Sequence, residues 1–476
     1  MKISLQFSKK VLPLIIFTIL IHAVVCAQWS PKISISPNAM WAGLNENSGQ
    51  CLAVNGDTVH VVWTDHRTLG HAIYYRHSPD AGVTWNTAIP ITDTTGTAIF
   101  PAIAVSGSTI HVVWLDSSLG VPASFYKRSL DGGNTWGPAV CLDSSTKFWP
   151  GVAASGSMVF VTLNKEIVIG NTEVFLRRSI DNGVTWEAEQ QISNAFGRSE
   201  DPAIAAQGSY IHLSWNDKRS GIMNIYYRRS SDAGVTWGPE TQLTTTDSYT
   251  SMVSLDSASV DVPYGSTTAG NFDVWLRQSS DTGSTFGTPQ QLTNDSLGQA
   301  YPYMVREGLN LHIVYFQFGY SAWYLHSGDG GVTWDSTFFL SNGSQPFIAI
   351  TGCALQVIFA DSGTIYYMRN PSGNCLASDV AEEPTSHANH LLLSAHPNLF
   401  SQLTTIQFTL AENSKATLKV YTLLGREVAT LIDGDRKAGE VCRVVFDASK
   451  LEPGMYFCHL SAGNSLVTKT LMLLKE

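Results

Sequence analysis

Carboxylates recur along this chain where they could act as acids, bases or hydrogen-bonding groups. Four aspartates each end an apolar segment, and such segments return about every fifty residues. Cleavage of a glycosidic bond needs two carboxyl groups about 5 to 10 Å apart, one of them with a raised pKa. The carboxylates that could form such a pair are Asp65, Asp116, Asp217, Glu200 and Asp361.

Guanidinium groups and aromatic rings stand near these carboxylates in the repeats. Sugars stack their C–H faces on aromatic rings, and their hydroxyls bind charged, bidentate partners. We therefore expect a ligand-binding set of Arg67, Arg198, Arg219, Phe100, Trp149 and Tyr301. Three further residues stand just before an apolar segment, as the three aromatic residues do: Asp201, Thr250 and Gln345.

Both sets also have a structural interpretation. Asp65, Asp116 and Asp217 recur in register, so they could cap their own loops and pair with Arg67 or Arg219. The aromatic residues could fill a central channel. Histidine also recurs in register inside the apolar segments, which favours packing over metal binding, at His60, His111, His212 and His312. The sequence therefore predicts no metal site, and we expect no cofactor.

The motif Ser-x-Asp-x-Gly-x-Thr-Trp defines the repeat. It occurs six times, with phenylalanine replacing tryptophan in the fifth copy, and successive aspartates are 51, 50, 51, 49 and 48 residues apart. Aspartate accepts hydrogen bonds from the backbone of its own turn, and glycine supplies a positive φ angle. We expect a structural role for the motif aspartates Asp80, Asp131, Asp181, Asp232, Asp281 and Asp329.

A period near fifty without a helical pattern indicates one four-stranded sheet per repeat, because each unit must stack on its neighbours to bury its apolar face. The sequence therefore predicts an all-β protein containing a β-propeller. A seventh copy of the first three strands spans 346–369, and residues 29–36 have the pattern of its missing fourth strand. We expect seven blades, with the N-terminal strand closing the last blade.

The position of the motif predicts which face of the propeller binds a ligand. The motif occupies the turn between the third and fourth strands of a blade, on the same face as the turn between the first and second strands. The loops between the second and third strands lie on the opposite face, together with the connections between blades. The candidate residues fall in those loops and connections, so we expect the ligand on the face opposite the motifs.

The repeated motif is the Asp box, and residues 28–375 resemble the sialidase-like superfamily of BNR-repeat propellers. Sialidases in that superfamily have six blades and carry an Arg-Ile-Pro motif, three arginines that grip a carboxylate, a Tyr/Glu nucleophile pair and an aspartate acid/base. No Arg-Ile-Pro occurs in this chain. The resemblance therefore implies the fold, disfavours exo-sialidase activity and assigns none of those catalytic roles.

Both ends of the chain indicate export. Residues 1–27 place three lysines before an apolar run, which is typical of a secretory signal peptide. A polar linker is expected at 376–390. Residues 391–476, with His396-Pro397-Asn398-Leu399-Phe400 and Val420-Tyr421-Thr422-Leu423-Leu424-Gly425, resemble the type A C-terminal sorting domain of the type IX secretion system. That resemblance implies a small β-sandwich, passage through the periplasm, and release or attachment at the outer-membrane surface without a transmembrane segment in the mature chain.

Charge and cysteine content restrict the partners. The chain between the signal peptide and the sorting domain holds 17 basic and 31 acidic residues, which disfavours nucleic acid. The scattered cysteines do not form a disulfide framework, although Cys353 with Cys375 and Cys442 with Cys458 are allowed pairs. Two functions remain open: a secreted, non-catalytic propeller that binds extracellular glycan or protein, and a glycoside hydrolase or lyase that uses two of the carboxylates.

Overall fold

The computed structural model divides the chain into two compact units, Met1–Val380 and Ala381–Glu476. In the first unit it describes 29–373 apart from 38, 46–48, 68–69, 147–148 and 269–270. In the second it describes 392–473 apart from 397–398, 401, 411–412, 423–425, 438–440 and 463–464. The expected signal peptide and linker lie outside the described residues. The described residues form strands, turns and loops and contain no helix. Among them there is accordingly no helix long and apolar enough to cross a membrane.

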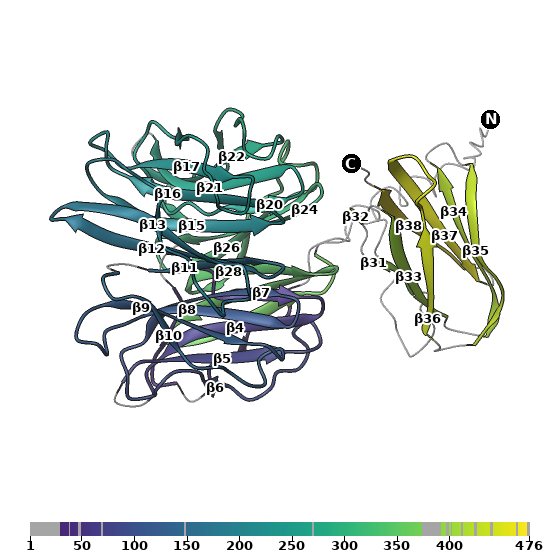
Figure 1. Cartoon of the computed structure of the whole chain (residues 1–476), viewed down its shortest axis with the longest axis horizontal. Helices are drawn as coiled ribbons and strands as arrows, with labels where there is room; N and C mark the ends of the chain where they lie inside the picture. Colours follow the sequence, from purple (N-terminus) through teal and green to yellow (C-terminus); the bar gives the residue numbers. More distant parts are fainter. Residues whose placement is uncertain are drawn as a thin grey trace, which may run out of the picture. The chain divides into compact units, whose positions relative to one another are not determined.

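Seven sheets of four or five strands form the described part of the first unit, drawn from purple to green in Figure 1. Blade 1 consists of β2 to β6 (Ala42–Gly43, Leu52–Asn55, Thr58–Asp65, Ala72–Ser78, Ile89–Pro90). Blade 2 consists of β7 to β10 (Ile99–Ser106, Thr109–Asp116, Ala123–Ser129, Val140–Asp143). Blade 3 consists of β11 to β14 (Gly151–Ser155, Met158–Val168, Asn171–Ser179, Gln190–Gln191). Blade 4 consists of β15 to β18 (Ser199–Gln207, Tyr210–Asp217, Asn224–Ser230, Thr241–Gln242). Blade 5 consists of β19 to β23 (Ser248–Tyr249, Ser254–Asp256, Ser259–Thr268, Asn271–Ser279, Gln290–Gln291). Blade 6 consists of β24 to β27 (Gln299–Glu307, Asn310–Gln317, Ser321–Ser327, Phe338–Asn342). Blade 7 consists of β28 to β30 (Ser344–Thr351, Ala354–Asp361, Thr364–Asn370) together with β1 (Ile33–Ser34).

The sheets form a closed ring. Their innermost strands contact one another in the order β3, β7, β11, β15, β20, β24 and β28, and β28 contacts β3. The strand β1 pairs antiparallel with β30, with Ile33 opposite Tyr367. This pairing confirms the predicted closure of the last blade by the N-terminal strand, and the number of sheets equals the predicted number of blades. Closure removes the free sheet edges that an open array would leave.

Burial on both faces explains why these segments form inner strands. The strand β4 is buried along almost its whole length, including Val61, Val62 and Trp63. Branched and aromatic side chains suit a pleated sheet covered on both faces. The core of the ring therefore lies between the blades.

Each Asp box is held by its own hydrogen bonds. In the third box, Asp181 accepts from the hydroxyl of Ser179 at 2.7 Å and from the backbone amide and hydroxyl of Thr185 at 2.9 and 2.6 Å. These bonds, those from Thr185 above all, hold the pKa of Asp181 well below its usual range. Gly183 has a φ of 76°, and a Cβ atom there would lie 2.0 Å from the hydroxyl of Tyr126 in the preceding blade. The box is therefore a turn that packs against the neighbouring blade.

The recurring histidines of blades 1, 2 and 4 each contact a tyrosine of their own blade, and that tyrosine packs against the box of the next blade. In blade 1, Nδ1 of His60 lies 2.7 Å from the hydroxyl of Tyr75, which donates to the carbonyl of Gly132 in the next box. Nδ1 of His111 contacts Tyr126 at 2.7 Å, and Nδ1 of His212 contacts Tyr227 at 2.5 Å. These contacts agree with the packing interpretation of the histidines. We call the His–Tyr pairs of blades 1, 2 and 4 the interblade histidine pairs.

The substitution Asp181→Asn tests the structural role of the box. We expect a lower melting temperature, because the amide nitrogen cannot accept the bonds that Thr185 and Ser179 donate. Any saccharide affinity should be nearly unchanged. The measurement is a thermal melt beside a binding titration, with Asp57→Asn at an exposed turn as the control for loss of one charge. Loss of binding at an unchanged melting temperature would place the functional site on the box face instead.

The second unit is built from two sheets that share one core. Its strands, yellow-green to yellow in Figure 1, are β31 to β38 (Leu392–His396, Leu399–Phe400, Leu403–Thr409, Ser414–Thr422, Glu427–Arg436, Val441–Asp447, Gly454–Ala462, Ser465–Leu473). One sheet has the order β31-β33-β36 and the other β32-β38-β37-β34-β35. Phe408 and Phe446 of the first sheet pack with Leu418 and Leu460 of the second. This is the expected small β-sandwich.

The cysteines correct one expectation. Cys442 and Cys458 are both free thiols. They lie on β36 and β37, which belong to different sheets, so the pairing of Cys442 with Cys458 was wrong. Cys353 is disulfide-bonded, while Cys375, the partner expected from the sequence, lies outside the described residues.

Candidate functional site

A cavity of about 330 Å³ opens on the face opposite the Asp boxes, over blades 4, 5 and 6. It collects residues from strand ends and from the connections between blades. We call it the acidic aromatic pocket, and its lining residues are Asp201, Asn216, Asp247, Tyr249, Thr250, Phe272, Ala300, Tyr301 and Phe318. Both carboxylates and aromatic rings therefore reach a single hollow.

Left-handed backbone at the strand starts supports the pocket. Asp201, Thr250 and Tyr301 have φ angles of 54°, 54° and 53°, values that residues other than glycine rarely adopt. Bulges interrupt the pairing of β15 with β16 and of β24 with β25 at two of these positions. Such strain costs about 1 to 3 kcal/mol per residue and clusters at functional sites. The same conformation recurs at Phe100 and Gln345.

Asp201 is the most perturbed acid of the pocket. Its Oδ2 accepts a hydrogen bond of 2.9 Å from the side-chain amide of Asn216. Burial, with a smaller contribution from the charge of Glu200, raises the pKa of Asp201 to about 7. At neutral pH both the protonated and the ionised form of this carboxyl group are therefore populated. A protonated carboxyl can donate a proton or a hydrogen bond to a ligand oxygen.

A second carboxylate and a tyrosine complete the polar part of the pocket. Asp247 accepts from the backbone amide of Met223 at 3.1 Å and from the hydroxyl of Tyr249 at 3.2 Å. Burial and the bond to Asp247 raise the pKa of Tyr249. The Tyr249 ring is followed by those of Phe272, 5.7 Å away between centroids, and Phe318, 6.3 Å from Phe272. The side chain of Phe318 is 44% exposed and so presents its ring at the mouth.

Two of the aspartates expected to be catalytic are buried in their own blades. The Asp65 carboxylate accepts from Nε1 of Trp63 and from Nε and Nη2 of Arg67, at 2.6 to 3.0 Å. Asp217 repeats this arrangement with Trp215 and Arg219. The Asp65 and Asp217 side chains are 0% and 1% exposed. Both guanidiniums lie 4.1 Å from a tyrosine ring of the same blade. This geometry agrees with the structural interpretation of the sequence, in which these aspartates cap their loops and pair with the arginines.

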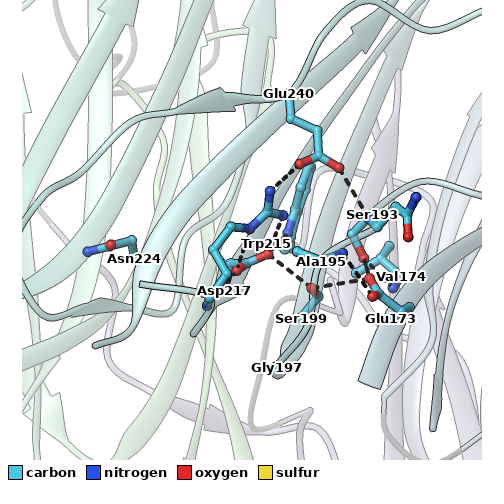
Figure 2. A network of polar contacts seen from close by, with 12 residues as sticks. Glu173, Val174, Ser193, Ala195, Gly197, Ser199, Trp215, Asp217, Asn224 and Glu240 are labelled. Atoms are coloured by element: carbon cyan, nitrogen blue, oxygen red, sulfur yellow. Dashed lines mark hydrogen bonds and ion pairs between the residues drawn. The ribbon is translucent and has the colours of Figure 1, made fainter. Parts of the chain in front are cut away.

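Asp217 also joins a network between blades 3 and 4. Figure 2 shows the Ser199 hydroxyl between the carboxylates of Glu173 and Asp217, at 3.4 and 3.0 Å. Glu173 also accepts from Ser193 and from the backbone amide of Ala195. Burial raises the pKa of Glu173. Because Ser199 is two residues before Asp201, the network anchors the strand that carries the pocket acid.

The other predicted residues are distributed around the ring. Asp116 accepts from the Thr97 hydroxyl at 2.8 Å and from the Ser118 amide at 2.7 Å, whereas Asp361 pairs with Lys32 at 2.7 Å where β1 closes the last blade. Phe100 and Trp149 contact each other edge to face, 5.5 Å apart, between blades 2 and 3. Arg198 pairs with Glu200, next to the pocket. Of the predicted ligand-binding residues, Tyr301 alone lines the acidic aromatic pocket.

Most of the pocket is not predicted by the sequence. Asp201 and Thr250 are equivalents of the aromatic positions, but no repeated motif indicates Asp247, Tyr249, Phe272 or Phe318. One signal was available. The second strand of blade 5 ends in a different way from those of blades 1, 2 and 4, without a Trp-x-Asp sequence.

A larger cavity on the opposite side is a weaker candidate. It measures about 420 Å³ and surrounds the fifth Asp box, with Ser279, Thr285 and Arg306 in its lining. Arg306 is already engaged by the buried carboxylate of Asp261 at 3.0 Å. The lining includes no carboxylate and a single aromatic ring, Phe286. The acidic aromatic pocket therefore has the richer chemistry.

Comparisons with known proteins match both units. Residues 26–313 match the family model described as BNR repeat-like domain, and residues 394–474 match the one described as secretion system C-terminal sorting domain. Among solved structures, polysaccharide lyase Uly1 is 10% identical over 72% of this chain and 100% of its own, with a TM-score of 0.47. Trypanosoma rangeli sialidase is 10% identical over 81% and 85%, with a TM-score of 0.40. The NanB sialidase of Streptococcus pneumoniae is 12% identical over 72% of each chain, also with a TM-score of 0.40. No curated protein matches the chain.

Proposed function

We propose, because this chain belongs to the BNR repeat-like family, that it is a secreted propeller whose acidic aromatic pocket binds a saccharide. The C-terminal sorting domain directs the protein to secretion or to the cell surface by the type IX system. The single observation that carries the proposal is one cavity lined by aromatic rings and by two carboxyl groups.

The chemistry of the lining supports a sugar over other ligands. Rings at Tyr249, Phe272 and Tyr301 offer apolar faces for the C–H groups of a pyranose. Asp201 and Asp247 can bind hydroxyl groups through charged hydrogen bonds. A volume of about 330 Å³ lies at the small end of the range for ligand pockets and suits one or two sugar units.

Truncation of the rings tests this proposal. We expect Tyr301→Ala and Phe272→Ala each to weaken saccharide binding by about 1 to 3 kcal/mol, or roughly five- to hundredfold. Tyr301→Phe keeps the ring and should retain most of the affinity. The measurement is a glycan array followed by titration calorimetry with the saccharides that bind. The control is Phe339→Ala, because Phe339 is an exposed aromatic residue on β27 outside the pocket. Equal loss in the control, or capture of a protein and of no glycan, would contradict the proposal.

Asp201 supports a second candidate function, glycoside hydrolysis. Its carboxyl group, with a pKa of about 7, could give its proton to the glycosidic oxygen as the bond to the anomeric carbon breaks. Water would add to that carbon and lose a proton to Asp247, which lines the same cavity. Release of reducing sugar by wild-type protein, abolished in Asp201→Asn, would favour this function over binding alone. Turnover that survives Asp201→Asn would exclude Asp201 as the acid.

A further inference from the structure

We infer that the acidic aromatic pocket accepts a saccharide unit without negative charge and rejects uronates, sialic acid and sulfated sugars, an inference that rests on the proposed saccharide-binding function. The ionisable side chains of its described lining are those of two aspartates, Asp201 and Asp247, and two tyrosines, Tyr249 and Tyr301; no lysine, arginine or histidine is among these residues. Within this described lining, an anionic ligand would therefore meet two carboxyl groups and no basic side chain.

The cation whose charge acts on Asp201 and Tyr249 is paired with a carboxylate. The guanidinium of Arg198 forms an ion pair with Glu200, the neighbour of Asp201 in the chain. The charges of Glu200 and Arg198 both act on Tyr249 and on Asp201, so the pair lies beside the pocket. Pairing with Glu200 offsets the attraction of Arg198 for a carboxylate or sulfate in the pocket.

The other two arginines predicted for this face are occupied in the same way. Arg67 binds Asp65 through Nε and Nη2, and its guanidinium stacks on Tyr74. Arg219 is shared between Asp217 and Glu240 and stacks on Tyr226. Arg67 belongs to blade 1, and Arg198 and Arg219 to blade 4. Each of these three arginines is therefore paired with a carboxylate of this chain. They do not form a cluster that could bind the carboxylate of a ligand.

The same lining suits a neutral sugar. Hydroxyl groups can donate to Asp247 and to the ionised form of Asp201, and they can accept from the protonated form. Stacking on an aromatic ring requires only C–H faces and no ligand charge. Like charges brought together in a site are strongly repelled, and selectivity arises from that repulsion as much as from attraction.

The experiment compares saccharides that differ only in charge. Oligogalacturonides with free carboxylates are titrated beside their methyl esters, and sulfated galactan oligosaccharides beside desulfated ones, at pH 8 in 50 mM salt. We expect the uncharged member of a pair that binds to do so at least tenfold more tightly. Higher salt should narrow the ratio, because screening weakens the repulsion. In Asp247→Asn the ratio should also fall, whereas Asp57→Asn, with the same loss of charge at an exposed turn of the box face, should keep it.

The outcomes separate this inference from the function on which it rests. Equal or tighter binding of the anionic member, sensitive to Tyr301→Ala, would overturn the inference and leave saccharide binding in the pocket intact. Absence of binding to every saccharide tested, neutral or anionic, would overturn the proposed function and the inference with it. Discrimination that is unchanged in a folded Asp247→Asn protein would show that the pocket carboxylates do not cause it, and would also overturn the inference.

Discussion

Replacing Asp201 with asparagine should stabilise the protein at pH 8 while weakening its function. The carboxyl group has a pKa of about 7 in the folded protein and about 3.8 as the ordinary value. That difference corresponds to at most about 4 kcal/mol of free energy of unfolding. Asparagine is neutral at every pH, and its side-chain oxygen can still accept the hydrogen bond from Asn216. It also tolerates the left-handed backbone at this position.

The expected gain depends on pH in a defined direction. Below about pH 3.8 the carboxyl is protonated in both the folded and the unfolded chain, so the substitution changes little. Between about 3.8 and 7 the folded protein retains a proton that the unfolded chain has lost, and wild-type stability falls as pH rises. Above about 7 the whole penalty is present in the wild type and absent from Asp201→Asn.

Denaturant unfolding at pH 4, 6 and 8 measures this effect. The difference in free energy of unfolding between Asp201→Asn and wild type should grow across the series. Asp201→Ala, which also removes the acceptor for Asn216, should gain less. Asp57→Asn, at an exposed turn, controls for the change in net charge. A constant difference at all three pH values would show that Asp201 does not retain a raised pKa in the folded protein.

An acid whose ionised form destabilises the fold calls for a functional explanation. The φ angle of 54° at Asp201 recurs at the equivalent positions of other blades and belongs to the repeat. The raised pKa of Asp201 is the feature that sets this residue apart, and strongly perturbed pKa values cluster at functional sites. A gain in stability together with a loss of binding or turnover in Asp201→Asn would therefore support the site as well as the pKa.

The architecture could be predicted from the sequence because each box reports a local turn with fixed geometry. The Ser, Asp and Thr of one copy make the side-chain hydrogen bonds that hold its turn, so six copies locate six blades without knowledge of the rest. The closing strand was found in the same way, since residues 29–36 follow the pattern of a fourth strand and pair with β30.

The pocket could not be predicted as readily, because several of its residues stand outside the repeated motifs. The connection before the first strand of blade 5 supplies Asp247, and Phe318 follows the second strand of blade 6. The residues that do repeat, Asp65 and Asp217, bind tryptophan and arginine within their blades. Register in the sequence indicates the structural carboxylates, whereas Asp201 is distinguished by its raised pKa and its place in the lining of the pocket, neither of which the sequence displays.

Acid should weaken the ring through the interblade histidine pairs. Burial lowers the pKa of His60, His111 and His212 to about 4, from an ordinary value of 6.5, with smaller contributions from His77, Arg128 and Arg229 respectively. Above about pH 6.5 these histidines are neutral in both states. As pH falls from 6.5 to 4 the unfolded chain binds protons that the folded chain does not, so stability is lost, by about 3 kcal/mol for each residue at pH 4.

Blade 7 suggests the substitution that removes this sensitivity. Gln356 occupies the histidine position there, and its side-chain oxygen accepts from the hydroxyl of Tyr367. An amide does not titrate, and it can donate or accept in place of the imidazole. We therefore expect the triple variant of His60, His111 and His212 to Gln to gain stability relative to wild type as the pH is lowered from 7 to 4. The gain should approach the sum of the three contributions.

The comparison must be made between proteins at each pH, because Asp201 acts in the opposite sense over the same range. The box aspartates also contribute to stability, because hydrogen bonds lower their pKa values, that of Asp80 to about 2. This contribution to the free energy of unfolding is lost only below about pH 4. His111→Phe separates titration from hydrogen bonding, since blade 3 carries Phe160 at this position. It should show the same relative gain in acid as His111→Gln but be less stable than His111→Gln at every pH, because the Tyr126 hydroxyl loses its hydrogen bond to residue 111. Parallel stability curves for wild type and the triple variant between pH 7 and 4 would contradict burial of neutral histidines between the blades.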